Sequence, residues 1–347
     1  MAEVFGDIVI PGVYIEVKDE GLIRAGTVSI SNVGMVGTAE SGDDLDVSIL
    51  TTFDDAQQTY GGISGGTLVR GLKLAFDNGA RTIYAVKTPS GSVDDYEKGL
   101  NALLSRDVHL IVTPGASVTD ILPSVKAHNE MAENSHRERI SIVGCSKTVT
   151  DPDALQGLDD DDRTIIVAPG LLMRDGDALN EYSGSYTACA VAGLLSALPP
   201  HHSPTNKLLN IAGINRLYNY GELKALINAR VLAIEKKSGY RIVKGITTNS
   251  GAWKQITTRR IVDYAKYGVR SGSQPYIGRL NNERVRKSLA ATLDGFLAGM
   301  RQEEMLTEYS LEVSATRDDE IQGNCNVTMT LKPTFSIDYI KVTIYLG

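Results

Sequence analysis

Short apolar strands alternate with amphipathic helices between residues 47 and 198, and this rhythm limits the fold more than any other feature of the 347-residue chain. The strands are expected at Val47–Leu50, Thr82–Val86, Val108–Val112, Ile140–Val143 and Thr164–Val167. Strands that are almost entirely apolar are typical of a parallel sheet covered by helices on both faces. The helices between them carry one apolar stripe each, as at Leu68, Leu72 and Phe76. The pattern therefore predicts an α/β protein with a three-layer α/β core.

A second region with a different pattern follows the proline-rich loop Pro199–Pro204. It combines short strands with two longer helices, expected at Ile256–Tyr267 and Asn281–Met300. The expected division is an N-terminal arm over residues 1–24, an α/β core over residues 25–206, a smaller C-terminal α+β domain over residues 207–325 and a C-terminal arm over residues 326–347. The chain as a whole would then be α+β.

Both ends of the chain carry β-strand patterns, although termini are usually polar and frayed. From Asn326 to Gly347 apolar and polar residues alternate, with one change of phase at the Tyr339–Ile340 step. The segment Ile8–Val17 is similarly rich in β-branched residues. A strand without a partner exposes a pairing edge, which favours association with another chain. These features predict extended N- and C-terminal β-strand arms that add to neighbouring subunits.

Composition excludes several classes of partner. The net charge is −7 and no dense basic patch is present, which argues against nucleic acid. No apolar run approaches the roughly 20 residues of a transmembrane helix, so no direct membrane insertion is expected. The first residues lack the features of a secretory signal peptide, and assembly in the cytoplasm is therefore expected. Cys145, Cys189 and Cys325 are far apart, which favours small buried side chains over disulfides or a zinc site.

Several motifs look like chemical sites, but each lacks a defining part. Gly61–Gly66 has no P-loop lysine and is expected to be a turn. Asp159–Asp162 lacks the spacing of a calcium loop and is expected to be a solvated loop. His201–His202 has no further metal ligand close in sequence, and no GxSxG elbow frames a nucleophile. We therefore expect no catalytic residues, no metal and no cofactor.

Basic residues concentrate around the helix expected at Asn281–Met300. They are Arg279, Arg284, Arg286 and Lys287, preceded in sequence by Arg259 and Arg260. Arg284 and Lys287 lie three residues apart on the polar side of that helix. Two interpretations remain open, a solvated helix face or a cationic strip that faces an acidic protein partner.

Five groups of residues, spread almost from end to end, match one known family. They are Pro11–Glu16; Ser48–Ala56 with Tyr60–Gly61; Phe76–Ala80 with Tyr84–Lys87; Asn281–Glu283 with Val285–Met300; and Leu311–Thr316 with Pro333–Ile340. Together they resemble the contractile tail sheath proteins of phages and phage-tail-like particles. The chain looks most like the short sheath subunits of extracellular contractile injection systems, such as the antifeeding prophage and the Photorhabdus virulence cassette.

The resemblance implies a structural protein and not an enzyme. Such a subunit polymerises helically around an inner tube and contracts to drive the tube through a target envelope. Its partners would be other copies of itself, the inner tube protein, baseplate and terminator or cap proteins, and paralogous sheath proteins. It would be part of a phage tail or an extracellular tail-like particle. The weaker alternatives are a tube or baseplate component of the same particle and a cofactor-binding α/β enzyme.

The resemblance also implies two contact surfaces. The arms would meet neighbouring subunits through Val13, Tyr14, Ile15, Phe335, Ile337, Tyr339, Ile340 and Val342. The helix Asn281–Met300 would face the tube, with Arg284, Arg286 and Lys287 opposite acids of the tube protein.

Overall fold

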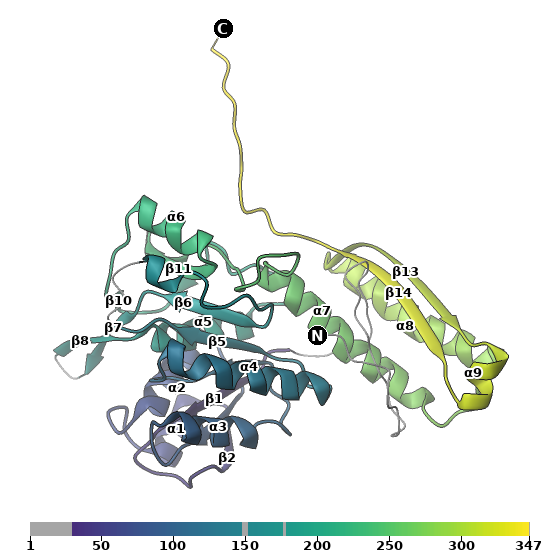
Figure 1. The fold of residues 1–347 in the computed structure, drawn as a ribbon, viewed down its shortest axis with the longest axis horizontal. Helices are drawn as coiled ribbons and strands as arrows, with labels where there is room; N and C mark the ends of the chain where they lie inside the picture. The colour runs from purple at the N-terminus through teal and green to yellow at the C-terminus, as the bar shows by residue number, and fades with distance from the viewer. Residues whose placement is uncertain (1–29, 148–151, 176–177, 347) are drawn as a thin grey trace. The chain divides into compact units, whose positions relative to one another are not determined.

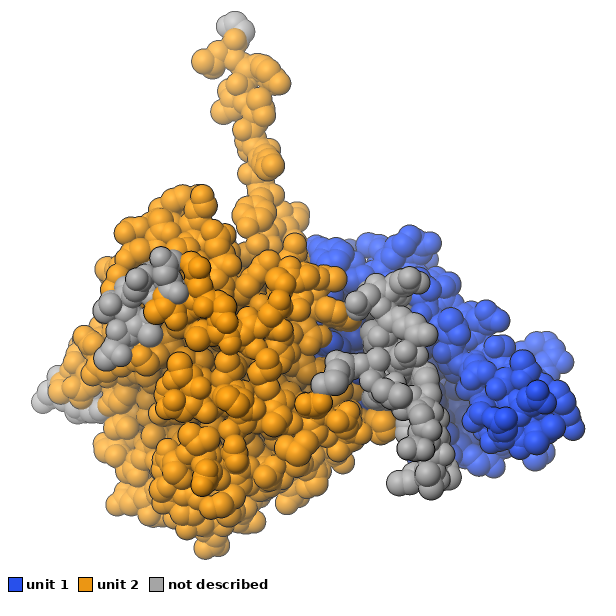
Figure 2. Space-filling model, viewed as in Figure 1, with its two compact units in different colours: residues 1–30, 257–335 blue, residues 31–256, 336–347 orange. Residues whose placement is uncertain are grey.

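The computed structural model of the chain describes residues 30–147, 152–175 and 178–346. These residues form two compact units, which Figure 2 colours separately. The sheet unit comprises residues 31–256 and 336–346, and the hairpin unit comprises residues 257–335 together with Ile30. The chain therefore leaves the sheet unit after Ile256 and returns to it at Ser336.

A nine-stranded sheet forms the centre of the sheet unit (Figure 1). In spatial order its strands are β2 (Val47–Leu50), β3 (Ile83–Lys87), β1 (Val33–Gly37), β4 (Leu110–Val112), β5 (Ile140–Gly144), β6 (Thr164–Ala168), β11 (Val231–Lys236), β12 (Tyr240–Ile242) and β9 (Leu208–Leu209). The strands from β3 to β11 are parallel, and the strands outside them pair antiparallel. Every residue of β4, β5 and β6 is buried, which explains their apolar sequences.

Helices cover both faces of this sheet, as the sequence predicted. On one face lie α1 (Phe53–Tyr60), α2 (Thr67–Asp77) and α5 (Gly184–Ala197), and on the other lie α3 (Val93–Ala102), α4 (Val118–Asn134) and α6 (Tyr220–Asn228). A short 3₁₀ helix, η2 (Pro152–Leu155), precedes β6. The start of α1 follows from its cap, because the Thr52 side chain accepts a hydrogen bond from the Asp55 backbone N–H. The three-layer α/β core is confirmed.

Small residues let α5 approach its neighbours closely. A Cβ atom at Gly193 would overlap the backbone carbonyl of Ala75 on α2. A Cβ atom at Gly144, on β5, would overlap the backbone of Gly184 and Ser185 at the start of α5. The backbone contacts therefore require glycine at these two positions.

The hairpin unit combines two long helices with a two-stranded antiparallel sheet (Figure 1). Its elements are α7 (Ile256–Ser273), η3 (Gln274–Tyr276), α8 (Glu283–Gln302), β13 (Leu306–Ser314), α9 (Arg317–Gln322) and β14 (Asn326–Pro333). The apolar face of the hairpin, which includes Leu311, Met329 and Leu331, packs in one cluster with Leu289 and Leu293 of α8. The opposite face of the hairpin is polar and exposed.

A small antiparallel sheet completes the sheet unit. Its strands, in order, are β10 (Gly213–Ile214), β7 (Leu171–Asp175) and β8 (Ala178–Tyr182). The sequence pattern did not predict β7 and β8, because the exposed β8 lacks apolar alternation.

Two expected boundaries differ from the structure. The core was expected to end at residue 206, whereas residues 208–256 belong to the sheet unit, since β11 pairs with β6 on one side and β12 on the other. The C-terminal arm was expected from Asn326, whereas β14 pairs with β13 of the same chain. The described segment without helix or strand structure, residues 334–346, is named the tail here.

The expectation for the cysteines holds at two of three positions. Cys145 and Cys189 are buried, and burial raises the pKa of the Cys145 thiol to about 12. Cys325 is exposed, because it lies in the turn between α9 and β14 and not in the core.

Candidate assembly surfaces

The tail exposes an unusual amount of apolar surface. The exposed fractions are 59% for Phe335, 81% for Ile337, 83% for Ile340 and 75% for Val342. Ile344 and Leu346 continue the series. Large apolar side chains exposed in succession mark an interaction site, since their burial would be favourable by about 25 cal/mol per Å². Val13, Tyr14 and Ile15, the other predicted arm contacts, lie outside the described residues.

Tyr339 differs from the other predicted tail contacts. Its ring is exposed, but its hydroxyl accepts a hydrogen bond from Lys244 Nζ at 2.9 Å. The neighbouring Asp338 also contacts Lys244, at 3.5 Å. Lys244 and Asp338 were not predicted from the sequence, where the only available signal was that Asp338 is the one acidic residue of the tail.

The hairpin presents two strand edges. Within the described residues, β13 pairs only with β14, so each strand has one edge without a partner strand. The exposed polar face carries a cross-strand ion pair between Glu308 and Lys332, which lowers the pKa of the Glu308 carboxyl. Glu312 lies on the same face, opposite Thr328. A two-stranded sheet with one apolar face is marginal by itself, and open edges accept further strands.

The three predicted cations of α8 have different surroundings. Arg286 donates to Glu320 Oε1 and to Asn281 Oδ1, both at 2.9 Å, and thereby connects the start of α8 to α9. Lys287 pairs with Glu283 at 2.7 Å on the exposed surface, and this contact lowers the pKa of the Glu283 carboxyl. Arg284 is exposed. The structure therefore gives Arg286 an intrachain contact and leaves Arg284 and Lys287 at the surface.

The exposed face of α8 that contains Arg284 continues with small residues. Ser288, Ala291, Gly295 and Ala298 follow at helical spacing, and all are exposed. A Cβ atom at Gly295 would meet no atom within 4 Å. Glycine inside a helix is less favourable than alanine by about 1 kcal/mol, and no steric contact in the described structure requires it here.

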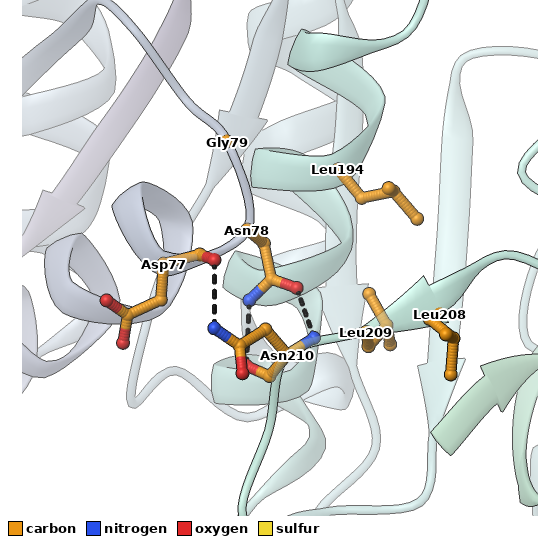
Figure 3. A pocket seen from close by; sticks show the side chains of 7 residues that line it. All are labelled: Asp77, Asn78, Gly79, Leu194, Leu208, Leu209 and Asn210. Atoms are coloured by element: carbon orange, nitrogen blue, oxygen red, sulfur yellow. Dashed lines mark hydrogen bonds between the residues drawn. The ribbon is translucent and has the colours of Figure 1, made fainter. Parts of the chain in front are cut away.

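The described residues show no arrangement suited to catalysis. A hollow of about 470 Å³ is lined by Asp77, Asn78, Gly79, Leu194, Leu208, Leu209 and Asn210 (Figure 3). The Asn78 side chain accepts from Asn210 N at 2.8 Å and donates to Asn210 O at 3.1 Å, and the Asp77 carboxylate pairs with Lys73. The polar groups of the hollow therefore hold the fold together. Among the described residues, no group of three or more His, Cys, Asp or Glu could hold a metal ion, and no helix is long and apolar enough to cross a membrane.

Comparison with known protein families shows to which family the chain belongs. The model of the phage tail sheath protein central domain matches residues 91–248, and that of the phage tail sheath C-terminal domain matches residues 248–347. The chain belongs to the phage tail sheath family. It is a structural sheath subunit and not an enzyme, as the sequence resemblance implied. Among curated proteins, no sequence matches it significantly.

Solved sheath structures share the fold over nearly the whole chain. The contracted sheath of the extracellular contractile injection system PVC superposes with a TM-score of 0.77 at 17% identity, covering 98% of each chain. The contracted helical sheath of the anti-feeding prophage gives a TM-score of 0.75 at 16% identity, covering 98% of this chain and 99% of that one. A sheath tail protein of Desulfitobacterium hafniense gives 0.68 at 12% identity, covering 93% and 100%.

Proposed function

We propose that this chain polymerises helically with copies of itself around an inner tube, and that contraction of the polymer drives the tube through a target envelope. The observation that carries the proposal is the apolar, exposed tail in a chain that also offers open strand edges on its hairpin. The similar structures include a contracted helical sheath and a baseplate of the anti-feeding prophage, which supports copies of itself, a tube and a baseplate as partners. Cap proteins and paralogous sheath proteins would join the same particle.

The sheath mechanism assigns a role to each part of the chain. The sheet unit forms the body of the subunit, and the hairpin unit carries the tube-facing helix and the strand-accepting edges. The tail and residues 1–24 are the arms. Assembly takes place in the cytoplasm of the producing cell, and the finished subunit is part of a phage tail or an extracellular tail-like particle.

The alternating pattern of the tail fits the two faces of the hairpin. Ile340, Val342, Ile344 and Leu346 lie on one side of an extended strand, and Lys341, Thr343 and Tyr345 lie on the other. An added strand would continue the apolar face with its first set and the polar face with its second. Because one face is apolar, a shift of register by one residue would expose the whole apolar set.

The face of α8 with Arg284 and Lys287 is proposed to contact the tube. Its small residues would let the backbone of a partner approach closely, and the two cations would meet acids of the tube protein. Arg286 would support this face indirectly, by holding α9 against the start of the helix. Arg284→Glu combined with Lys287→Glu should reduce sheath formation on co-expressed tube protein. Lys236→Glu combined with Lys237→Glu, at two exposed lysines of the sheet unit, serves as the matched control.

Electron microscopy of tail variants tests the proposal most directly. Val342→Asp and Ile344→Asp place a charge in the apolar set, and Thr343→Asp places the same charge in the polar set. The proposal predicts hollow cylinders for the parent chain and Thr343→Asp, and their loss for the other two variants. Circular dichroism should show all of these chains folded. Equal assembly by all of them would contradict strand addition by the tail.

A further inference from the structure

The first four residues of the returning chain, Ser336–Tyr339, are attached to the sheet unit. Gln255 Nε2 donates to Asp338 Oδ2 at 3.2 Å, and Gln255 Oε1 accepts from Ser336 N at 3.4 Å. Lys244 Nζ lies 3.5 Å from the same Asp338 oxygen. It also donates to the Tyr339 hydroxyl and lies 4.8 Å from the centre of its ring.

The polar contacts of this attachment end at Tyr339, and its buried side chains are polar ones, since Ile337 and the Tyr339 ring are exposed. The side chains of Asp338 and Lys244 are only 12% and 16% exposed, and Gln255 is 8% exposed. The apolar side chains from Ile340 onward are exposed by 75% or more. The tail is therefore divided into an attached root and a free end, and the division falls between Tyr339 and Ile340.

The fold of the sheet unit fixes the positions of Lys244 and Gln255, the two residues that bind Ser336–Tyr339. Lys244 lies two residues after the end of β12, and the next residue, Gly245, donates its N–H to Thr205 Oγ1 at 3.0 Å. Gln255 pairs as an isolated bridge with Ile246. Both side chains that hold the root therefore project from one short segment whose backbone is itself fixed.

We propose that Lys244 and Gln255 form an intrachain latch that holds Asp338 and Tyr339 and so sets the length of tail free to reach another subunit. With the latch closed, residues 340–346 span at most about 24 Å when extended. Opening the latch adds Ser336–Tyr339, or about 13 Å. The consequence for reach rests on the proposed strand addition, whereas the latch itself does not.

The latch also allows the free part of the tail to lengthen when neighbouring subunits move apart. Sheath contraction displaces subunits relative to one another, and an arm of fixed length would have to release its neighbour. Opening an ion pair and three hydrogen bonds lengthens the arm while its free end stays paired. In the closed latch the Tyr339 hydroxyl contacts its own chain, and the contact of Tyr339 with a neighbouring subunit stays a prediction.

Spin-label mobility in the monomer fraction of the full-length chain tests the latch. In a Cys325→Ser background, labels are placed at Ile337→Cys, inside the root, and at Ile344→Cys, in the free end. The latch predicts several-fold slower label motion at position 337 than at position 344. Lys244→Met and Asp338→Asn should each raise the mobility at position 337 toward that at position 344, because either change leaves the remaining charge without its countercharge.

Two further variants keep the result interpretable. Lys254→Met changes an exposed lysine of the same segment and should leave the mobility at position 337 unchanged. Lys244→Asp combined with Asp338→Lys should restore part of the restriction, since the pair is reformed with its charges exchanged. Equal mobility at 337 and 344 in the parent chain, or no effect of Lys244→Met, would overturn the latch.

Assembly measurements test the latch and the proposed strand addition separately. If label motion shows the latch but a chain ending at Tyr339 still forms cylinders, the latch stands and strand addition by the tail fails. If that shortened chain fails to assemble while label motion shows no latch, strand addition stands and the latch fails.

Discussion

The globular part of the sheet unit, residues 31–256, and the tail differ in where buried charges and exposed apolar side chains find partners. In the sheet unit, buried charges find partners in the same chain: Arg163 binds both carboxylate oxygens of buried Glu133, at 2.8 and 2.9 Å. Buried Arg139 donates to the carbonyl of Leu103 and to His128. In the tail, by contrast, apolar side chains from Ile340 to Leu346 face solvent. Buried charged groups of residues 31–256 therefore bind partners in the same chain. The exposed apolar side chains of the tail have no such partner and are available to another molecule.

This contrast suggests that some residues are needed for folding and others for assembly. Changes in the sheet unit should act on folding, because its interactions close within one chain. Changes in the tail and on the free surfaces of the hairpin unit should act on assembly and leave folding unaffected. The predictions below test that division, beginning with the largest expected effect.

Gly144→Val should unfold the sheet unit. The added side chain would meet the backbone of α5, which cannot move without separating the helix from the sheet. A loss of 4 kcal/mol or more is expected, which corresponds to a fall in Tm of roughly 10 °C or to insolubility. Gly62→Val is the matched control, because a Cβ atom there meets nothing within 4 Å. Similar melting of both variants would show that this contact does not hold α5.

Acid should weaken the sheet unit through His128. Burial, with a smaller contribution from the Arg139 guanidinium, lowers the pKa of His128 to about 3. The unfolded chain, with an ordinary pKa near 6.5, then binds more protons between those two values. The contribution of His128 to stability is complete above pH 6.5 and is lost as the pH falls toward 3, by about 1.4 kcal/mol per pH unit at most.

Denaturant unfolding of the parent chain and His128→Gln, compared between pH 7 and pH 4, measures this contribution. The neutral amide of glutamine does not titrate, so the difference in stability between the two chains should change with pH. Other titrating groups act on both chains and cancel in the comparison. A difference that stays constant with pH would show that His128 is not held neutral by the fold.

Much of the sheet unit was predictable, because its signals are local. Strands β3 to β6 are almost entirely apolar, and Thr52 is a typical N-cap residue at the start of α1. By contrast, β9 and β10 have two residues each and exist only through their partners in the sheet. The extent of the C-terminal arm was not predictable either, because β14 within a hairpin and a free arm show the same alternation.

The candidate site was predictable only in part, for a related reason. Exposed apolar residues such as Ile340 follow from the pattern of the tail. The contact between Lys244 and Tyr339 joins residues 95 positions apart, and no local pattern encodes such a pair. The contact of Arg286 with Glu320 spans 34 positions, so an arginine on a polar helix face looked the same whether paired or free.

Gly295→Ala, on α8, should raise the stability of the chain and at the same time reduce sheath assembly. Alanine favours the helix by about 1 kcal/mol, and its methyl group would meet no atom of the described residues within 4 Å. The isolated chain should therefore melt 2–4 °C higher, by the roughly 2–4 °C per kcal/mol expected of large domains. If this face contacts the tube closely, sheath formation on co-expressed tube protein should fall at the same time. Higher stability with unchanged assembly would place the tube contact elsewhere.

The smallest expected effect comes from a single ion pair, which would show whether the tail of a neighbouring copy lies beside β13 or beside β14. Lys341 is the only basic residue of the tail, and on the polar face the β13 strand carries Glu308 and Glu312 whereas β14 carries Lys332. Glu308 already pairs with Lys332, which leaves Glu312 as the complementary charge. Such a cross-strand pair contributes only about 0.2–1 kcal/mol, but it recurs at every subunit of a polymer. We therefore expect the tail of a neighbouring copy to lie beside β13, with Lys341 near Glu312.

Charge exchange tests the edge. Glu312→Lys and Lys341→Glu should each shorten or deplete the cylinders seen by electron microscopy, and the double variant should recover them because the opposite charges meet again. Thr328→Lys places the same new charge directly across the hairpin, on β14. It should weaken assembly less than Glu312→Lys if the tail lies beside β13, since it occupies Glu312 without reversing the charge that Lys341 meets. Loss of cylinders with Thr328→Lys but not with Glu312→Lys would move the tail to the β14 edge and leave strand addition itself intact.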